Sequence, residues 1–408
     1  MKRVVITGLG VISSIGITQA EVTRSLREGL SGIALDPERR ARGFRSCLSG
    51  QVKGFDPVQR FDRKARRTLG EAAAYGCAAA FDAIADSGLD PKSLANPEVG
   101  AIFGNDSTCQ AAEPMFTELA QQGRTSALGS GHIIKVMNST VTMNLATMLG
   151  LQGACWSLSA ACASGLHALG QASMLVATGS QKIIICGGAQ ETSWQGMAAF
   201  DALGALSANE EDPARASRPF DKRRDGLVSS GGGAALVVES LDSARERGAR
   251  IYAEVIGYAF GCDGEHLTNP SGAGAKRAME GALRQANVHP AEVDYVHAHA
   301  TSTPVGDAVE AKAITSIFGN AASRVPVSST KGITGHECWM AGASEVAYCL
   351  LMMREGFIAG NPHLEQPDEA AAGLNLPVGA LNVRPRTILK NSFGFGGTNA
   401  SVVLRAVD

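Results

Sequence analysis

Short, uniformly apolar runs alternate with stretches of helical periodicity along the whole chain. Runs that are apolar at every position are typical of strands buried on both faces of a sheet. The expected strands span residues 4–6, 99–103, 154–158, 182–186, 234–239, 251–257, 293–298, 388–392 and 400–404. The expected helices span residues 20–28, 64–86, 275–285, 307–318 and 343–355.

This alternation predicts an α/β protein whose sheets are covered by helices on both faces. A chain of 408 residues exceeds what one hydrophobic core usually supports, so more than one packing unit is expected. No low-complexity linker separates the parts, and no repeat between them is visible in the residues. We therefore expect two tightly packed halves, residues 1–245 and 246–408.

Composition narrows the class of protein. The 37 Lys and Arg residues nearly balance the 39 Asp and Glu residues, which gives a net charge of -2. This balance argues against a nucleic-acid-binding protein, and an apolar content of 45% is too high for a disordered chain. The nine cysteines form no CxxC pair, and no apolar run is long enough to cross a membrane. The sequence predicts a cytoplasmic protein with no nucleic-acid or membrane partner.

The segment Thr7-Gly8-Leu9-Gly10, after the first strand, is similar to the opening of a dinucleotide-binding fingerprint. Ser13 stands where that fingerprint needs a third glycine. A lone GxG is weak evidence, so a nucleotide-dependent oxidoreductase is a minor alternative.

The strongest chemical signal is the segment at residues 157–170, where an apolar strand leads through small residues into a helix. Cys162 stands at or just before the start of that helix. There the helix dipole and free N–H groups are expected to lower the pKa of a thiol. The small neighbours leave room for a thioester and for backbone N–H groups that face its oxyanion. From this segment alone, a nucleophile and a buried structural cysteine are equally good interpretations of Cys162.

Two of the eight histidines are candidate partners for a nucleophilic thiol. His299 follows the predicted strand at 293–298, and His336 lies in a Gly- and Thr-rich loop before a helix. Loops at strand ends are where α/β proteins collect functional side chains. His297 and His299 point the same way by strand alternation, but no matching ligand cluster supports a metal site.

Near the end of the chain, residues 391–399 form a run rich in Gly and Asn between two strands. Such a run favours a contorted turn. It also contains two aromatic rings, Phe393 and Phe395, which indicate a pocket wall or gate. A plain hairpin with a flexible tip is the simpler alternative.

Together these segments resemble the β-ketoacyl-acyl-carrier-protein synthases of the thiolase superfamily. Among the type I and type II elongating enzymes, the likeness is greatest to type I. It covers essentially the whole chain, from residues 1–8 to 402–404, and includes residues 201–207 and 224–226. The resemblance implies a thiolase-like α/β fold of two fused halves, layered αβαβα with mixed sheets, in a homodimer.

The resemblance also implies an acyltransferase mechanism that needs no metal and no organic cofactor. Cys162 takes an acyl group from acyl carrier protein, malonyl carrier protein loses CO2, and the resulting enolate attacks the acyl-enzyme. His299 and His336 hydrogen-bond the malonyl thioester oxygen, and Lys331 orients this site.

Further site residues follow from the same resemblance. The backbone N–H groups of Cys162 and Phe395 form the oxyanion hole, and the Phe395 ring is a gate. The supporting and pantetheine-binding residues are Glu345, Phe393, Thr301 and Thr303. Candidate contacts for an acidic carrier protein are Lys64, Arg66 and Arg67.

Two departures from the family pattern bear on the substrate. Ala300 stands where the family has a glycine after the first histidine, and its methyl group restricts the loop if φ is positive. Residues 337–340, Glu-Cys-Trp-Met, follow His336 where the family has a loop of small residues.

We expect a 3-oxoacyl-[acyl-carrier-protein] synthase for fatty acid chain elongation. No cysteine follows Cys349, which argues against a degradative thiolase. One alternative is a ketosynthase of a specialised polyene or polyketide pathway, alone or in a heterodimer with a chain-length factor. A catalytically silent partner subunit is the alternative from another class.

Overall fold

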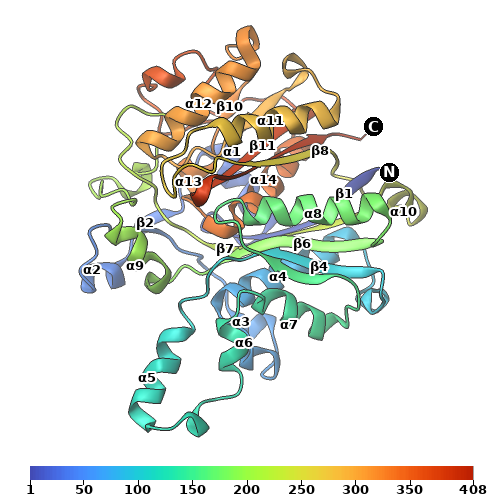
Figure 1. The fold of residues 1–408 in the computed structure, drawn as a ribbon, viewed down its shortest axis with the longest axis vertical. Coiled ribbons are helices and arrows are strands. Elements are labelled where there is room, and N and C mark those ends of the chain that lie inside the picture. The colour runs from blue at the N-terminus through green and yellow to red at the C-terminus, as the bar shows by residue number, and fades with distance from the viewer. Residues whose placement is uncertain (408) are drawn as a thin grey trace.

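The computed structural model describes residues 1–407, and its centre is a 10-stranded mixed sheet (Figure 1). The strands lie in the order β10-β9-β11-β12-β8-β1-β7-β6-β4-β5. Those of the N-terminal half are β1 (Val4–Ile12), β4 (Val99–Gly104), β5 (Cys155–Leu158), β6 (Ile183–Gln190) and β7 (Gly232–Ser240). Those of the C-terminal half are β8 (Ala253–Cys262), β9 (Tyr295–His297), β10 (Val327–Ser328), β11 (Thr387–Gly394) and β12 (Thr398–Arg405). A separate small sheet pairs β2 (Ile33–Leu35) with β3 (Leu48–Gly50).

The two halves of the large sheet repeat one topology. In each half the first strand pairs with the last, the last with the fourth, the fourth with the second and the second with the third. The first two of these pairings are antiparallel and the other two are parallel. Antiparallel pairing of β1 with β8 joins the halves. The sheets that the sequence predicts are therefore continuous with one another.

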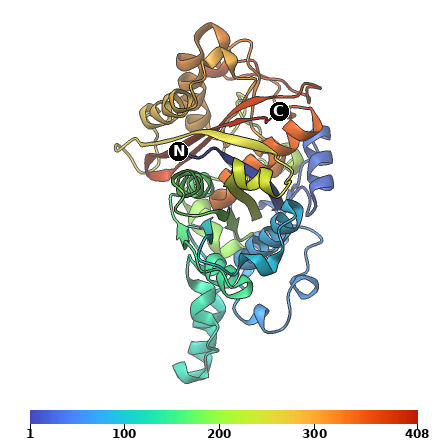
Figure 2. The ribbon, with the colours of Figure 1, turned by 90° about the vertical axis from the view of Figure 1, so that its right-hand side faces the viewer.

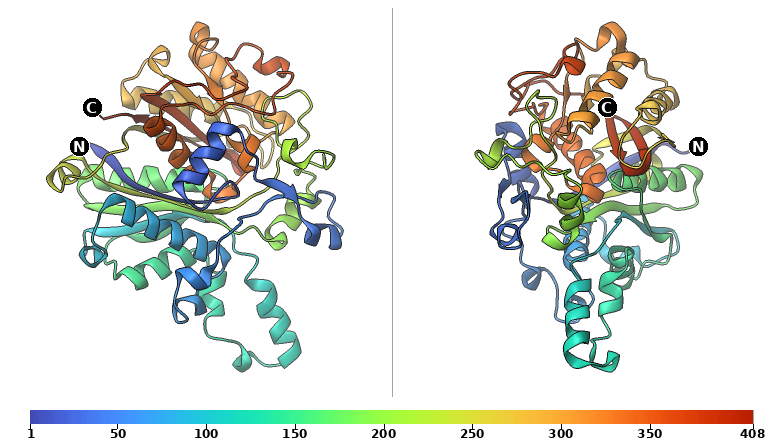
Figure 3. Two further views of the ribbon diagram at one scale, coloured as in Figure 1. Left: turned by 180° about the vertical axis from the view of Figure 1, so that it is seen from behind. Right: turned by 60° about the vertical axis from the view of Figure 1, so that its left-hand side comes forward.

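Helices form three layers around the two halves of the sheet (Figures 1 and 3). The outer face of the N-terminal half packs against α4 (Glu71–Ser87) and α7 (Thr140–Leu149). The helices α8 (Ser164–Thr178) and α14 (Ala341–Glu355) lie between the halves. The outer face of the C-terminal half packs against α11 (Ala273–Ala286) and α12 (Pro304–Phe318). The layers thus follow the expected order αβαβα.

The remaining helices are short or lie at the periphery. They are α1 (Gln19–Glu28), α2 (Pro37–Ala41), α3 (Pro57–Arg60), α5 (Ala112–Gln122), α6 (His132–Val136), α9 (Trp194–Ala202), α10 (Leu241–Glu246) and α13 (Lys331–Thr334). Figure 2 shows α5 on an arm that projects from the layered body. Within residues 1–407, every helix is too short or too polar to span a bilayer.

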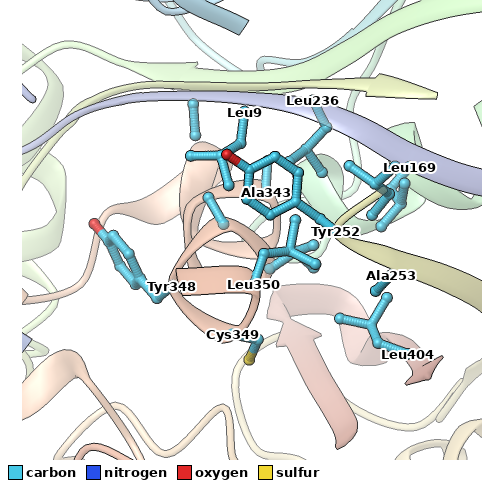
Figure 4. Close-up of a cluster of buried hydrophobic side chains, with 14 of the residues drawn as sticks. Leu9, Leu169, Leu236, Tyr252, Ala253, Ala343, Tyr348, Cys349, Leu350 and Leu404 are labelled. Atoms are coloured by element: carbon cyan, nitrogen blue, oxygen red, sulfur yellow. The ribbon is translucent and has the colours of Figure 1, made fainter. Parts of the chain in front are cut away.

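Strand β7 shows why the apolar runs lack polar alternation. Ala235 and Val237 face the outer helix layer, whereas Leu236 and Val238 face the central one. Both faces of the strand are therefore buried, and both select apolar residues. Figure 4 shows the central cluster, in which side chains of α14 such as Leu350 pack among residues of the sheet and α8.

The glycines of the N-terminal GxG segment serve helix packing. A Cβ at Gly8 would lie 2.2 Å from the Ala83 carbonyl oxygen, and one at Gly10 would lie 2.1 Å from that of Ala79. Both carbonyls belong to α4, which lies directly on β1. Close approach of this helix accounts for the two glycines without a nucleotide.

The predicted helix at 64–86 is wrong at its start. A 3-10 turn occupies Ala65–Arg67, and the helix itself begins at Glu71 after Gly70, whose backbone is extended. The Thr68 hydroxyl donates to Asn144 on α7 at 2.6 Å, which ties the interrupted segment to the neighbouring helix. Tertiary contacts therefore override the local helical pattern.

Candidate active site

Cys162 lies in the tight turn that joins β5 to α8. Ala161 has a φ of 47°, in the left-handed region that residues other than glycine seldom adopt. The Ser164 hydroxyl accepts from the N–H of Ala160 at 2.8 Å, and the N–H of Ala161 donates to Asp106 at 3.0 Å. These hydrogen bonds hold the turn, so the thiol has a fixed position just before the helix begins.

His336 contacts this thiol directly, with Nε2 2.9 Å from Sγ of Cys162. The histidine follows α13 on a segment that runs beside the N-terminal half of the chain. Its N–H donates to the Val228 carbonyl at 2.6 Å, and its carbonyl accepts from the N–H of Ser230 at 2.9 Å. Pairing between segments far apart in sequence thus brings the imidazole to the cysteine.

His299 completes a group of three, at the end of β9. Its ring centroid lies 5.3 Å from that of His336, and its N–H donates to Glu310 at 2.9 Å. The ligand atoms of Cys162, His299 and His336 lie within 4.8 Å of one another. His297 does not belong to this group, because its Nε2 lies 3.1 Å from a threonine hydroxyl elsewhere.

Three buried charges support His299. Lys331 Nζ donates to the His299 carbonyl at 2.6 Å, lies 3.4 Å from its Nδ1 and pairs with one oxygen of Glu345. The other Glu345 oxygen lies 2.8 Å from Nζ of Lys390. Sequence reasoning missed Lys390. The available signal was a lysine inside the apolar run that became β11.

The electrostatics of this group keep both histidines neutral. Burial lowers the pKa of His336 to about 3, and Lys331 acts in the same direction. Burial and Lys331 also hold the pKa of His299 well below its ordinary value. Burial opposes ionisation of Glu345, but Lys331 and Lys390 together bring the pKa of that carboxyl down to about 2. Positive charge next to the imidazoles thus comes from the lysines.

The expected lowering of the Cys162 pKa is wrong for the unliganded site. Burial raises the pKa of this thiol to about 12, and the nearby Lys331 only partly opposes that effect. The position of Cys162 at the start of a helix is therefore not enough to ionise its thiol. The thiol and the His336 imidazole therefore face each other as two neutral groups.

We expect the alkylation of Cys162 by iodoacetamide to accelerate continuously between about pH 6 and about pH 9, by up to ~10-fold per pH unit, because the thiolate is the reactive form. The rate is measured by mass spectrometry of the Cys162 peptide. The exposed Cys109 in the same digest controls for reagent decay. A rate that levels off near neutral pH would contradict the raised pKa of this thiol.

A cavity of about 380 Å³ leads to the cysteine and the two histidines. Its wall includes four further predicted site residues, Thr301, Thr303, Phe393 and Phe395, whereas the candidate carrier-protein contacts Lys64, Arg66 and Arg67 lie outside it. The two threonine hydroxyls lie 3.0 Å apart. Phe395 is 38% exposed, and its ring stacks on that of Phe200 with their centroids 5.8 Å apart. The structure therefore gathers the predicted site residues from strand ends and loops of both halves.

The two departures from the family pattern differ in their consequences. Ala300 does not have a positive φ, so its methyl group does not strain the backbone. Residues 337–340 are fully packed. Glu337 accepts from Ser344 and, at 2.7 Å, from Tyr348, and burial raises the pKa of its carboxyl to about 7.

The cysteine and the two histidines are also chemically suited to Zn²⁺, which accepts thiolate and imidazole ligands. A metal held there would occupy the sulfur. Metal binding by this group and nucleophilic attack by Cys162 therefore exclude each other.

Comparisons with known proteins agree with this geometry. Two family models match the chain, "Beta-ketoacyl synthase, N-terminal domain" at residues 1–244 and "Beta-ketoacyl synthase, C-terminal domain" at residues 252–365. The 3-oxoacyl-[acyl-carrier-protein] synthase 1 of Escherichia coli K12 is 43% identical over 408 residues, which cover 99% of each chain.

Two solved structures extend the likeness to the whole fold. A β-ketoacyl synthase from Burkholderia phymatum STM815 superposes with a TM-score of 0.95 at 33% identity. The AntDE:AntF complex, a type II polyketide synthase acyl-carrier protein with its ketosynthase, gives 0.90 at 29% identity. Each comparison covers 100% of both chains. The expected family and fold class are confirmed.

Proposed function

The chain belongs to the β-ketoacyl synthase family, and from this premise we propose that it is an acyltransferase of fatty acid chain elongation. It condenses an acyl-enzyme thioester with malonyl-acyl carrier protein and releases CO2. The observation that carries this proposal is the 2.9 Å contact between the Cys162 thiol and His336 at the end of a cavity, with His299 alongside.

The first step loads the acyl group. His336 Nε2 accepts the thiol proton while the Cys162 sulfur attacks the carbonyl carbon of the acyl thioester. Backbone N–H groups of Cys162 and Phe395 stabilise the oxyanion. The C–S bond to the carrier then breaks, and the leaving sulfur takes the proton from His336. The enzyme is left as a neutral thioester.

The second step uses both histidines as hydrogen-bond donors to the malonyl thioester oxygen, so after loading the single ring proton of neutral His336 moves from Nδ1 to Nε2. The bond to the carboxylate breaks, CO2 leaves, and the electron pair becomes the enolate. The enolate carbon attacks the acyl-enzyme, and the Cys162 sulfur departs as a thiolate that takes a proton from water. Lys331 donates toward Nδ1 of His299, which places the ring proton on Nε2, the atom that serves the substrate.

The cavity has the chemistry of a pantetheine channel. Hydroxyl groups of Thr301 and Thr303 line it beside apolar rings. A phosphopantetheine arm carries amides that need hydrogen bonds and methylene groups that need apolar walls. We assign these threonines to that arm, and Phe395, half exposed at the wall, to the gate.

The test is a two-stage reaction of the full-length protein. Incubation with acyl-acyl carrier protein is expected to add one acyl mass, which maps to the Cys162 peptide. Malonyl-acyl carrier protein then removes that mass and yields CO2 and a 3-oxoacyl product. A protein that takes up no acyl group and releases no CO2 would be the silent subunit, and the proposal would fail.

Reversing the charge of Lys64 and Arg67 to glutamate is expected to raise the KM for acyl-acyl carrier protein by about 10-fold. Both side chains are exposed, Lys64 just before the 3-10 turn and Arg67 at its end. Steering by complementary charge is lost when the sign of the charge changes. The same variant should react normally with a short pantetheine thioester. An unchanged KM would move the docking surface elsewhere.

The assembly and setting complete the proposal. We expect a homodimer in the cytoplasm, with residues 1–245 and 246–408 as its two structural units, and sedimentation equilibrium tests the dimer. A monomer that becomes active only with a second, cysteine-free subunit would instead indicate a heterodimer with a chain-length factor.

A further inference from the structure

The acyl group on Cys162 needs a place of its own. Under the proposed function, on which this inference rests, both carriers deliver their pantetheine arms to the same sulfur. The malonyl arm must therefore occupy the cavity while the first acyl group is still attached. That acyl group has to lie on the side of the sulfur away from the pantetheine channel.

Apolar side chains pack around the cysteine outside the cavity. Cys162, Met197, Cys338 and Trp339 form one buried apolar cluster, against which Phe200 packs. The Phe200 ring lines the cavity, and its centroid lies 6.3 Å from that of the Trp339 ring, which does not line the cavity. Phe200 therefore contacts both the open channel and the tryptophan, and the indole lies behind Phe200 in the cluster that contains the cysteine.

The backbone leaves Trp339 little freedom to withdraw. Cys338, immediately before it, has a φ of 44° in the left-handed region. A Cβ at Gly188 would lie 2.6 Å from the Met340 Cα, and one at Gly165 would lie 3.1 Å from the Trp339 carbonyl oxygen. These contacts show that the segment is pressed against β6 and α8, so longer acyl groups cannot be admitted by moving it.

The indole is also an unusual residue for a purely structural core. Its Nε1 is buried without a hydrogen-bond partner. An unsatisfied buried N–H is unfavourable for folding. A tryptophan that forms part of the substrate-facing wall explains this unpaired N–H better than a tryptophan selected for stability alone.

We propose that Trp339 is the specificity-determining residue that restricts the acyl-enzyme to short acyl groups. The indole occupies the volume that several methylene groups of a longer chain would need. Butyryl groups are short enough to end before the indole, whereas dodecanoyl groups meet it. Replacement by glycine opens the space behind the sulfur without touching the catalytic atoms.

The experiment follows acyl-enzyme formation by intact mass, with butyryl-, octanoyl- and dodecanoyl-acyl carrier protein supplied separately. For the wild type, the initial rate should fall with chain length. For Trp339→Gly, the ratio of the dodecanoyl rate to the butyryl rate should rise by at least about 10-fold. The ratio is taken within one preparation, so a partly folded variant does not distort it. Trp339→Leu, which keeps apolar bulk, should show a smaller rise in the same ratio.

Trp156→Gly is the matched control, because this tryptophan is 41% exposed and lies outside both the cluster and the cavity. It should keep the wild-type ratio. A wild type that accepts dodecanoyl as fast as butyryl groups, or an unchanged ratio in both Trp339 variants, would overturn the inference. Absence of any adduct from any chain, with no CO2 from malonyl carrier protein, would instead overturn the proposed function.

Discussion

Cys162→Ala is expected to abolish acyl-enzyme formation and to reduce condensation by at least ~10⁴-fold, as removal of a nucleophile does in other covalent enzymes. No other sulfur replaces it, because among the described residues only Cys162 joins the two histidines in the site. Intact mass after incubation with acyl carrier protein thioesters measures the loss.

The same variant should still release CO2 from malonyl-acyl carrier protein. In the proposed mechanism His299 and His336 hold the malonyl oxygen. The Cys162 sulfur only carries the acyl group that the enolate attacks. The enolate then takes a proton and leaves as an acetyl thioester. Cys109→Ser, at an exposed cysteine, is the matched control and should keep both activities. Acyl transfer that survives in Cys162→Ala would remove this residue from its assigned role.

The sequence predicts most strands of the large sheet, because burial on both faces leaves a simple pattern. Residues such as Leu236 and Val237 face opposite helix layers, yet both must be apolar. The edges of the elements depend on other contacts. β1 extends to Ile12, beyond the run at 4–6, because Gly8 and Gly10 are strand residues that accommodate α4.

The repeated topology of the two halves is not visible in the residues. Each half needs apolar strands and helices in the same order along the chain. Many different sequences meet this requirement, so the two halves need not resemble each other in sequence. The hydrophobic pattern does not specify that β1 pairs with β8, since these two strands belong to different halves of the chain. Such long-range pairing is determined by the assembled layers.

The candidate site was predicted through its motifs, whereas its electrostatics were not. Cys162 stands before a helix as expected, but burial dominates its environment and raises its pKa. The burial of a turn depends on the segments that pack over it, and the sequence of the turn alone does not show which segments these are. Lys390 was not predicted for a similar reason. A single lysine in β11 is recognisable as part of the site only once its ion pair with Glu345 is known.

His299→Ala and His336→Ala are expected to separate the two half-reactions. His299 lies beside the sulfur without a direct contact to it, so its loss should leave acyl-enzyme formation within a few-fold of wild type. Decarboxylation of malonyl carrier protein should fall by ~10²–10³-fold, the usual cost of losing one donor to a developing oxyanion. His336 Nε2 lies 2.9 Å from the sulfur. Because the proposed mechanism uses it both as the acceptor of the thiol proton and as a donor to the malonyl oxygen, its loss should slow both steps.

The measurement pairs the acyl adduct, followed by mass, with CO2 release in the same preparations. His289→Ala is the matched control, because this histidine caps a 3-10 turn outside the cavity. Equal defects of His299→Ala in both half-reactions would mean that His299 shapes the site as a whole rather than holding the malonyl oxygen. Normal acylation by His336→Ala would show that the thiol loses its proton by another route, since no other imidazole in the described structure contacts that sulfur.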